Sequence, residues 1–251
     1  MSCVNIRGCC IGEGRPKVII PIVEPTETAV LEKAAEFSTS RADCVEWRID
    51  CFEGAKNLPA IVHCAAKLRI ALKDKLLLFT FRTKAEGGKV ALAHEEYLHF
   101  IRTVLATDCA DLIDIEFFTA GPELPALIEE AHTAGAAVVC SSHDFHKTPP
   151  RAELVSRMVA MQRAGADLPK LAVMPQSRAD VLELLAATAE MADRHPETPI
   201  ITMSMGALGA VSRLSGEALG SAMTFANPGQ ASAPGQVSLN IVNEVLDALH
   251  L

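Results

Sequence analysis

The feature that most constrains the fold is a regular alternation of short apolar runs with longer segments of helical periodicity. Eight runs of strand length begin about 22 to 35 residues apart, which is the length of one strand-and-helix unit. They cover residues 18–23, 44–50, 77–82, 112–118, 137–143, 169–174, 200–205 and 222–226. Strands that alternate with helices form a parallel sheet through right-handed crossovers, and eight such units favour closure of that sheet into a barrel.

The segments between the runs carry apolar residues three and four positions apart, as in helices that bury one face. The clearest of these segments lie at residues 28–37, 123–132, 151–162, 178–185 and 240–249. The chain has 251 residues, and a (β/α)8 barrel needs about 250 as a single unit. We therefore predict one α/β domain over residues 1–251, a (β/α)8 TIM barrel.

The first 17 residues do not follow this repeat. The stretches 4–7 and 8–14 are typical of the two arms of a small β-hairpin. We expect this hairpin, residues 1–17, to close the bottom of a barrel formed by residues 18–251.

Composition and charge exclude several classes of partner. The chain is 49% hydrophobic but only 4% aromatic, so its core must be aliphatic, which suits parallel strands buried on both faces. Its 23 Lys and Arg against 31 Asp and Glu give a net charge of −8, which would repel nucleic acid or an anionic membrane but leaves room for a local basic pocket. No apolar run approaches the roughly 18 residues of a membrane span.

The expected compartment is the cytoplasm. The chain begins Met1-Ser-Cys-Val-Asn-Ile-Arg-Gly, without the apolar segment of a signal peptide. Its eight cysteines are scattered and include no Cys-x-x-Cys pair. We therefore expect free thiols rather than a disulfide framework or a zinc site.

In a barrel of this kind the active site lies at the C-terminal ends of the strands. Ionisable residues are dense at those positions of the sequence. They are Glu46, Arg48, Asp50, Arg82, Asp114, Glu116, His143, Asp144, Lys170 and Arg213. The chemistry of the protein is expected among these residues.

Lys170 lies in Leu168-Pro-Lys-Leu-Ala-Val-Met-Pro, an otherwise uncharged, apolar strand. A buried ammonium group is costly unless it is paired or has lost its proton. Lowering the pKa from the usual 10.4 to about 7 requires that the ammonium form be destabilised by about 4 kcal/mol. Burial and neighbouring guanidinium groups can together produce a destabilisation of that size. Two interpretations remain open: a neutral amine suited to Schiff-base chemistry with a carbonyl, or an ion pair with Glu46, Asp114 or Glu116.

His143 ends a predicted strand within Ser141-Ser-His-Asp-Phe-His. An imidazole with a pKa of about 6.5 can both take and give a proton near neutrality, which suits elimination of a hydroxyl group. A hydrogen-bonded packing role is the alternative. A metal site shared with His146 is disfavoured, because a three-residue spacing off a strand end does not place both rings on one face. We expect no metal.

Three arginines, Arg48, Arg82 and Arg213, come from separate units. Guanidinium groups bind carboxylates and polyols through paired hydrogen bonds, so three that converge at strand ends suggest that the ligand is an anionic small molecule. Each arginine alone could be a surface residue. The glycines at 87–88 and 206–209 match no nucleotide-binding fingerprint. The single Trp and single Tyr give no stacking platform for nucleic acid.

The segment 231–237 follows the last predicted strand and is rich in small residues around Pro234 and Gly235. Such a loop can act as a mobile flap that excludes water from a site, with Ser232 and Gln236 as hydrogen-bonding tips. An ordinary turn has the same composition.

Seven segments together resemble one known family, the type I 3-dehydroquinate dehydratases of the shikimate pathway. They are Glu46-Trp-Arg-Ile-Asp, Phe79-Thr-Phe-Arg-Thr-Lys-Ala-Glu-Gly-Gly, Ile113-Asp-Ile-Glu, Ser142-His-Asp-Phe, Pro169-Lys-Leu-Ala-Val-Met-Pro, Thr202-Met-Ser-Met-Gly with Ser212-Arg-Leu, and Ala231-Ser-Ala-Pro-Gly-Gln. One such segment would be weak support, but the set runs in the family's order from residue 46 to residue 236.

The resemblance implies a lyase that converts 3-dehydroquinate to 3-dehydroshikimate without cofactor or metal, commonly as a homodimer. It implies that Lys170 forms a Schiff base with the C3 carbonyl, that His143 moves protons at C2 and at the departing C1 hydroxyl, and that Glu86 positions His143. The remaining matched residues would bind substrate. They are Glu46, Arg48 and Arg82 for the ring hydroxyls, and Arg213, Ser232 and Gln236 for the carboxylate and its neighbouring hydroxyls.

One position departs from the family pattern. Relatives can place a serine near the C-terminal end of the first barrel strand, where this chain has Pro21, so we expect no substrate contact from that side chain. Two other functions stay open: an aldolase-like enzyme that forms a Schiff base on Lys170, and a non-catalytic barrel that binds an anionic metabolite. The latter would keep the arginines but has no need of Lys170, Glu86 and His143 together.

Overall fold

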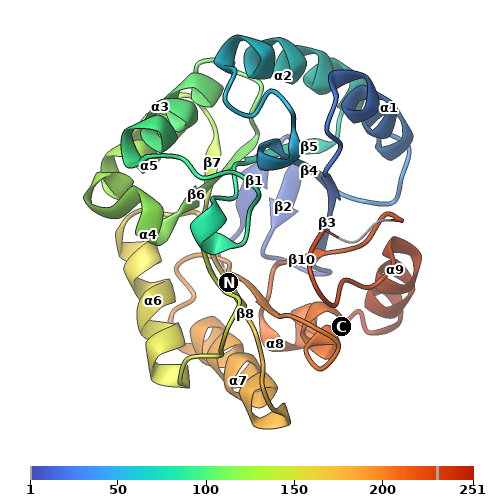
Figure 1. Ribbon diagram of the computed structural model, residues 1–251. Coiled ribbons are helices and arrows are strands. Elements are labelled where there is room, and N and C mark those ends of the chain that lie inside the picture. The colour runs from blue at the N-terminus through green and yellow to red at the C-terminus, as the bar shows by residue number, and fades with distance from the viewer. Residues whose placement is uncertain (1, 230–231) are drawn as a thin grey trace.

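Eight parallel strands form the centre of the molecule and helices surround them (Figure 1). The computed structural model describes residues 2–229 and 232–251, so Ala231 of the predicted flap lies outside the described part. The strands are β3 (Lys17–Ile22), β4 (Cys44–Arg48), β5 (Leu76–Thr80), β6 (Leu112–Glu116), β7 (Ala137–Asp144), β8 (Leu168–Val173), β9 (Ile201–Ser204) and β10 (Met223–Phe225). They pair in the order β10-β3-β4-β5-β6-β7-β8-β9, and a bridge between Ile200 and Ser221 brings the two ends of the sheet together. The predicted (β/α)8 barrel is confirmed.

The helices of the outer layer connect consecutive strands, except the last helix, which follows β10. The longer ones are α1 (Glu27–Phe37), α2 (Leu58–Leu72), α3 (His94–Leu105), α5 (Leu124–Thr133), α6 (Arg151–Arg163), α7 (Arg178–Arg194) and α9 (Leu239–Ala248). The connection from β9 to β10 is shorter, with only a 3-10 turn η4 (Ala210–Arg213) and the one-turn helix α8 (Gly216–Leu219). Three more 3-10 turns, η1 (Ile49–Cys51), η2 (Lys84–Glu86) and η3 (Gly121–Glu123), and the short α4 (Phe117–Ala120) complete the described elements.

Side chains along each barrel strand alternate between the interior and the helix layer, as the pleat requires. The outward-facing residues pack with the helices into one large apolar cluster. The inward-facing residues near the strands' N-terminal ends form a second cluster, which includes Ile19, Leu76, Leu112, Val139 and Leu168. On β6, β7 and β8 the inward positions farther along are mostly polar or charged: Asp114, Glu116, Ser141, His143 and Lys170. The apolar filling of the lower barrel therefore gives way to charged groups at the C-terminal mouth.

The N-terminal hairpin pairs β1 (Val4–Ile6) with β2 (Cys9–Ile11) in antiparallel register. Ile11 is fully buried and belongs to the interior cluster, so the hairpin covers the bottom of the barrel as predicted. The expectation that all cysteines are free thiols is wrong, because Cys3 and Cys10 form a disulfide. The hairpin brings their Cα atoms to 5.6 Å, within the range that a disulfide spans.

None of the helices within residues 2–229 and 232–251 is long and apolar enough to cross a membrane.

Candidate active site

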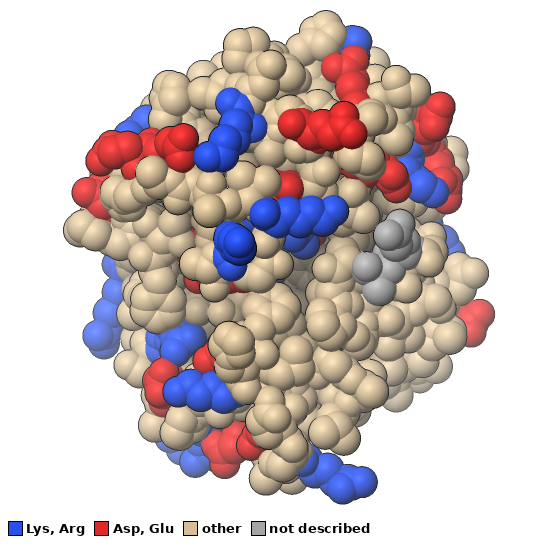
Figure 2. Space-filling view, in the orientation of Figure 1, with Lys and Arg blue, Asp and Glu red and all other residues tan. Residues whose placement is uncertain are grey.

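A cavity of about 220 Å³ opens at the C-terminal ends of the barrel strands. Lys and Arg side chains gather near the centre of this face (Figure 2). Eight of the nine residues that the sequence predicts for the site line the cavity, and the ninth, Glu86, lies behind His143. The rest of the lining is mostly apolar. It comprises Gly87, Phe145, Ala172, Met203, Met205, Phe225, Ala233 and Pro234.

Lys170 points into the barrel because it alternates with two inward-facing residues of β8, Leu168 and Ala172. Its side chain is only 3% exposed. The Nζ atom lies 3.0 Å from Oδ2 of Asp114 and 4.5 Å from the centre of the Phe225 ring. Of the three carboxylates that the sequence offers as ion-pair partners, the structure therefore selects Asp114.

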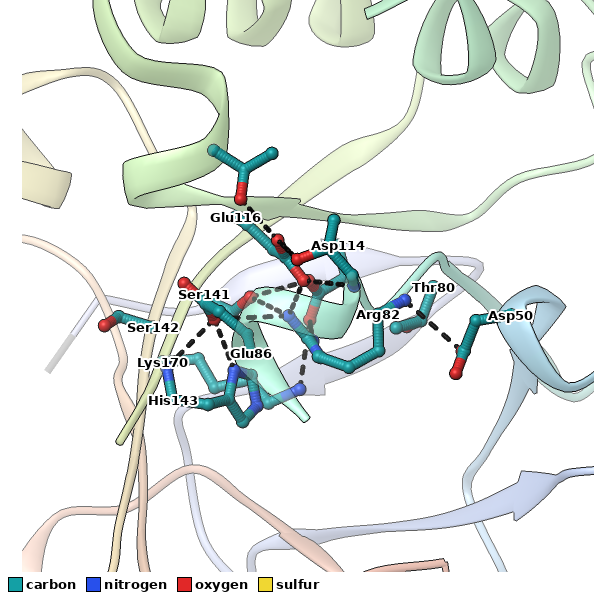
Figure 3. A network of polar contacts seen from close by, with 12 residues as sticks. Asp50, Thr80, Arg82, Glu86, Asp114, Glu116, Ser141, Ser142, His143 and Lys170 are labelled. Carbon is teal, nitrogen blue, oxygen red and sulfur yellow. Dashed lines mark hydrogen bonds and ion pairs between the residues drawn. The ribbon is translucent and has the colours of Figure 1, made fainter. Parts of the chain in front are cut away.

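Asp114 and Arg82 form the centre of a buried network (Figure 3). Arg82 Nη2 donates to Oδ2 of Asp114 at 2.8 Å, and the hydroxyl of Ser141 donates to Oδ1 of the same carboxylate at 2.6 Å. Burial alone would raise the pKa of Asp114, but Arg82, Lys170 and Ser141 hold it below its ordinary value. One carboxylate thus binds two cations and a hydroxyl.

Glu116 anchors the other side of the Arg82 guanidinium group. Its Oε1 accepts hydrogen bonds from Arg82 Nη1 at 2.8 Å and from the backbone N–H of Thr83 at 2.8 Å. Its Oε2 accepts from the hydroxyls of Thr83 and Thr119 at 2.7 and 2.6 Å. Because Glu116 is fully buried and has all these donors, it fixes Arg82 without itself reaching the cavity lining.

His143 and Glu86 form a second buried pair. One carboxylate oxygen, Oε2 of Glu86, accepts the backbone N–H of His143 at 3.0 Å and lies 2.9 Å from its Nδ1. Burial, followed by the charges of Arg82, Lys170 and Arg48, lowers the pKa of His143 well below its ordinary value. Burial also raises the pKa of Glu86 to about 8. The imidazole is therefore neutral at pH 7, and contact with Glu86 fixes its orientation.

The turn that carries Glu86 depends on the two glycines that follow it. A side chain at Gly88 would overlap the carbonyl oxygen of Arg82, and one at Gly87, where φ is +88°, would overlap the ring of Phe145. That ring in turn stacks on His143, with 6.5 Å between centres. The glycines, which fit no nucleotide motif, thus allow the tight turn that brings Glu86 to His143.

Arg48 and Glu46 extend the polar wall of the cavity from β4. Arg48 Nε and Nη2 donate to the two oxygens of Asp50 at 2.8 and 2.9 Å. Asp50 also accepts backbone N–H bonds from Arg82 and Lys89, so it joins the ends of β4 and β5. Glu46 is 3% exposed, and its Oε1 accepts the hydroxyl of Thr80 at 2.9 Å.

Arg213 is buried without a carboxylate partner among the described residues. Its Nη2 donates to the carbonyl of Pro234 at 3.2 Å, Nη1 lies 3.6 Å from the sulfur of Met203, and Nε has no partner. Burial lowers its pKa from the usual value of 12.5 to about 10. A buried guanidinium group that lines a cavity and lacks a counter-ion is a site for an anion.

The flap packs over this arginine. Gln236 Oε1 accepts the backbone N–H of Ser232 at 2.8 Å, and its Nε2 donates to the Ser232 hydroxyl at 3.0 Å. The Pro234 carbonyl also accepts the N–H of Gly206 at 3.2 Å. Gly235, with φ of +74°, lies so close to the backbone of Gly206 that a Cβ would overlap it. The close contact between Gly235 and Gly206 thus holds the loop against the barrel, with Ser232 and Gln236 in the cavity lining.

Two negative predictions concern the same region. Within the described ranges there is no group of three or more His, Cys, Asp or Glu side chains placed to hold a metal ion. Pro21 is buried in β3 and is not part of the cavity lining.

Comparison with known proteins gives a consistent result. The sequence model of a family described as type I 3-dehydroquinase matches residues 18–251. The 3-dehydroquinate dehydratases of Bacillus subtilis and Salmonella agona are 46% and 45% identical to the chain over 250 residues, covering 100% of it and 98% and 99% of their own lengths. A crystal structure of the type I 3-dehydroquinate dehydratase from Clostridium difficile, with covalently modified comenic acid, superposes with a TM-score of 0.96 at 42% identity, covering 99% of this chain and 98% of that one.

Proposed function

The chain belongs to the type I 3-dehydroquinase family and is a lyase of the shikimate pathway that dehydrates 3-dehydroquinate to 3-dehydroshikimate. From that premise we propose that it works through a Schiff base between Lys170 and the C3 carbonyl, with His143 as the proton-transfer group. The single observation that carries the proposal is the position of Lys170, whose amine is buried at the floor of the cavity with His143 and Arg213 in the same lining. The activity decides against the aldolase-like and non-catalytic alternatives.

The substrate carboxylate would bind Arg213. A buried guanidinium group without a counter-ion pays a desolvation cost that an anionic ligand removes, and two parallel N–H donors match a carboxylate. The partnerless Nε and the lowered pKa of Arg213 both support this assignment. Ser232 and Gln236 of the flap would hydrogen-bond to the carboxylate and its neighbouring hydroxyl.

The ring hydroxyls would face the polar wall. Glu46 uses one carboxylate oxygen for Thr80, which leaves the other as an acceptor. Arg82 spends three of its five N–H groups on Asp114, Glu116 and Ser141, so two remain as donors for a hydroxyl. Arg48 is held by Asp50 at the rim of the same wall. The remaining lining is mostly apolar, so the hydroxyls of the ring have the polar wall as their hydrogen-bonding surface.

The chemistry follows from the placement of the two bases. A protonated C=N bond at C3 draws electrons from the neighbouring carbon and acidifies its hydrogen at C2. Because Nδ1 faces Glu86, Nε2 is the ring nitrogen left to face the substrate, and it takes this proton in the tautomer of neutral His143 in which Nδ1–H donates to Glu86. The C1 hydroxyl then leaves, and the same imidazolium returns the proton to form water. Glu86 acts as a positioning residue because it holds His143, with Arg82 Nη1 3.6 Å from the same carboxylate oxygen, and does not line the cavity.

Reductive trapping tests the proposal. The protein is incubated with 3-dehydroquinate and borohydride, and its intact mass and labelled peptide are measured. We expect one stable adduct on Lys170, and no adduct in a Lys170→Ala variant. His143→Ala should still form the adduct, though more slowly, and should lose turnover, because Lys170 supplies the nucleophile of imine formation whereas removal of the C2 proton needs His143. Absence of an adduct from the wild-type protein, or a label on another lysine, would reject the assignment.

We further propose that residues 1–251 fold as one domain, with hairpin 1–17 and barrel 18–251, and that the enzyme is a cytoplasmic homodimer. Family membership supports the dimer. Six of the eight cysteines, at positions 9, 44, 51, 64, 109 and 140, are free, which supports a reducing compartment, whereas the Cys3–Cys10 disulfide of the hairpin does not. Light scattering should give twice the mass of the 251-residue chain, and a monomer mass would reject the dimer.

A further inference from the structure

The contact between Lys170 and Asp114 presents a chemical question for a Schiff-base enzyme. A carboxylate 3.0 Å from the amine stabilises the ammonium form, which is not a nucleophile. Asp114 is fully buried and takes no part in the cavity lining, so it does not bind substrate. Its role must therefore concern the lysine nitrogen itself.

The proton balance of imine formation shows what that role is. An ammonium group and a ketone condense to a protonated imine and water: R–NH3⁺ + O=C gives R–NH⁺=C + H2O. Two of the three N–H protons leave with the carbonyl oxygen, the N–C bond forms, the C–O bond breaks, and the positive charge stays on nitrogen. His143 can carry a proton between the nitrogen and the oxygen along the way. The charge beside Asp114 is thus the same before and after the reaction.

We propose that Asp114 is the positioning residue of the Schiff base: its Oδ2 binds one N–H of Lys170 before the reaction and keeps the single N–H that remains on the iminium nitrogen afterwards. This inference rests on the proposed Schiff base at Lys170. On this proposal the same contact between Asp114 and the Lys170 nitrogen exists before the reaction, as an ion pair with the ammonium group, and after it, as an ion pair with the iminium group.

A fixed N–H also fixes the C=N bond. The iminium nitrogen is trigonal, so one direction is taken by the Lys170 side chain, one by the N–H toward Asp114, and the substrate carbon must occupy the third. Phe225, whose ring centre lies 4.5 Å from Nζ, borders the nitrogen on another side. The direction and plane of the C=N bond are then set at the nitrogen, and with the substrate carboxylate on Arg213 this decides which face of C2 is presented to His143.

Asp114 can hold this position because it is held itself. Arg82 binds Oδ2 at 2.8 Å, and Ser141 binds Oδ1 at 2.6 Å (Figure 3). Arg82 is in turn fixed by Glu116. The carboxylate stays ionised, since Arg82 and Lys170 overcome the effect of burial on its pKa. It therefore offers the iminium a counter-ion that does not need to move.

Two neighbouring serines on β7 provide a matched test. Ser141 faces inward and donates to Asp114, whereas Ser142 faces outward and accepts a hydrogen bond from Arg157 of α6 at 3.1 Å. Both are almost fully buried, so Ser141→Ala and Ser142→Ala remove the same group from similar surroundings. Asp114→Asn is the direct variant, and the serine pair keeps the test valid if that variant does not fold.

The measurement is the rate at which 3-dehydroquinate and cyanoborohydride label Lys170, read by intact mass at a series of pH values, together with kcat and KM. We expect Asp114→Asn to slow labelling and kcat by about 10- to 100-fold and Ser141→Ala by about 3- to 10-fold, with Ser142→Ala unchanged. The alkaline end of the labelling profile should move to lower pH in Asp114→Asn, because an iminium without its counter-ion loses its proton more easily. A purely structural role would not produce that shift.

The outcomes separate the two claims. Labelling of Ser141→Ala at the wild-type rate and pH profile would overturn the role of Asp114 while leaving the Schiff base intact. Equal slowing in Ser141→Ala and Ser142→Ala would also overturn it, because the effect would then come from strand packing. An unlabelled wild-type protein would overturn the Schiff base itself, and this inference with it.

Discussion

Arg213 allows a prediction in which stability and activity change in opposite directions. Its guanidinium group is buried, its Nε has no partner, and no carboxylate contacts it among the described residues. Burial lowers its pKa from 12.5 to about 10. At 1.36 kcal/mol per pKa unit, charged Arg213 destabilises the fold by about 3 kcal/mol. The sign follows from linkage: a base with a lowered folded-state pKa costs stability at every pH below that value, and the cost fades only as the pH rises above about 10 toward the ordinary pKa of arginine.

Arg213→Met keeps the apolar stem and removes the charge. The loss of the hydrogen bond to the Pro234 carbonyl offsets about 1 kcal/mol of the gain, so the free energy of unfolding should rise by about 2 kcal/mol. For a chain of this size that raises Tm by roughly 4 to 8 °C. The same change should lower kcat/KM by roughly 100- to 1000-fold, because two charge-assisted hydrogen bonds to the substrate carboxylate are lost.

Thermal melts at pH 7 with and without 3-dehydroshikimate, together with steady-state kinetics, measure both effects. Arg48→Met is the matched control, because it leaves buried Asp50 without its cation and should destabilise the protein by about 3 kcal/mol. Added ligand should raise the Tm of wild type but barely that of Arg213→Met. The reasoning fails if Arg213→Met melts below wild type, or if it retains wild-type kcat/KM.

Three further predictions follow from the geometry of the flap, the base and the Glu86 turn. Gly235→Ala should raise KM about tenfold or more, because its Cβ would overlap the Gly206 backbone and lift the flap. The control, Gly206→Ala, is strained by a similar φ of +69° but its Cβ would only contact Met174 at 3.7 Å, so it should change KM much less. Equal KM values in the two variants would refute the contact between Gly235 and Gly206. The midpoint of the acid limb of the kcat/KM profile should lie well below pH 6.5, because buried His143 must be neutral to take a proton and its pKa is lowered. A pH-rate profile with that midpoint at or above 6.5 would contradict this. Gly88→Ala should lower kcat by roughly 10- to 100-fold with the fold retained, because a Cβ there would overlap the Arg82 carbonyl and displace Glu86 from His143. An unchanged kcat in an assay of the purified variant would count against the role of the turn.

The barrel could be predicted from the sequence because its signal is repetitive. Each strand appears as a short apolar run, and eight runs at regular spacing allow few architectures. The short connection between β9 and β10 was not predicted, since a four-residue helix such as Gly216–Leu219 gives too little periodicity to detect. The disulfide between Cys3 and Cys10 was missed for a similar reason: it depends on where the hairpin turns, which the spacing of the cysteines does not determine.

The site was predictable in its residues but not in its contacts. Resemblance to the family named the nine candidates, and strand alternation explains why Glu46, Arg48, His143 and Lys170 line one cavity. Arg213, Ser232 and Gln236 reach the same cavity from the segments that follow β9 and β10. The sequence offered Lys170 three possible carboxylate partners, and only the register of β6 beside β7 and β8 places Asp114 at the nitrogen. The sequence places Asp50 and Glu116 among the ionisable residues at the strand ends but does not show which side chains they hold, and it does not single out Ser141, because buried polar residues that hold other side chains leave no local pattern.

The central claim is that one nitrogen, on Lys170, carries the substrate while Arg213 holds its carboxylate. A crystal structure of the borohydride-reduced complex with 3-dehydroquinate tests this most directly. It should show a covalent bond from Nζ of Lys170 to C3, the carboxylate on Arg213, Nε2 of His143 facing C2, and the Asp114 carboxylate still within hydrogen-bonding distance of Nζ. A bond to another residue, or a carboxylate placed away from Arg213, would contradict the account.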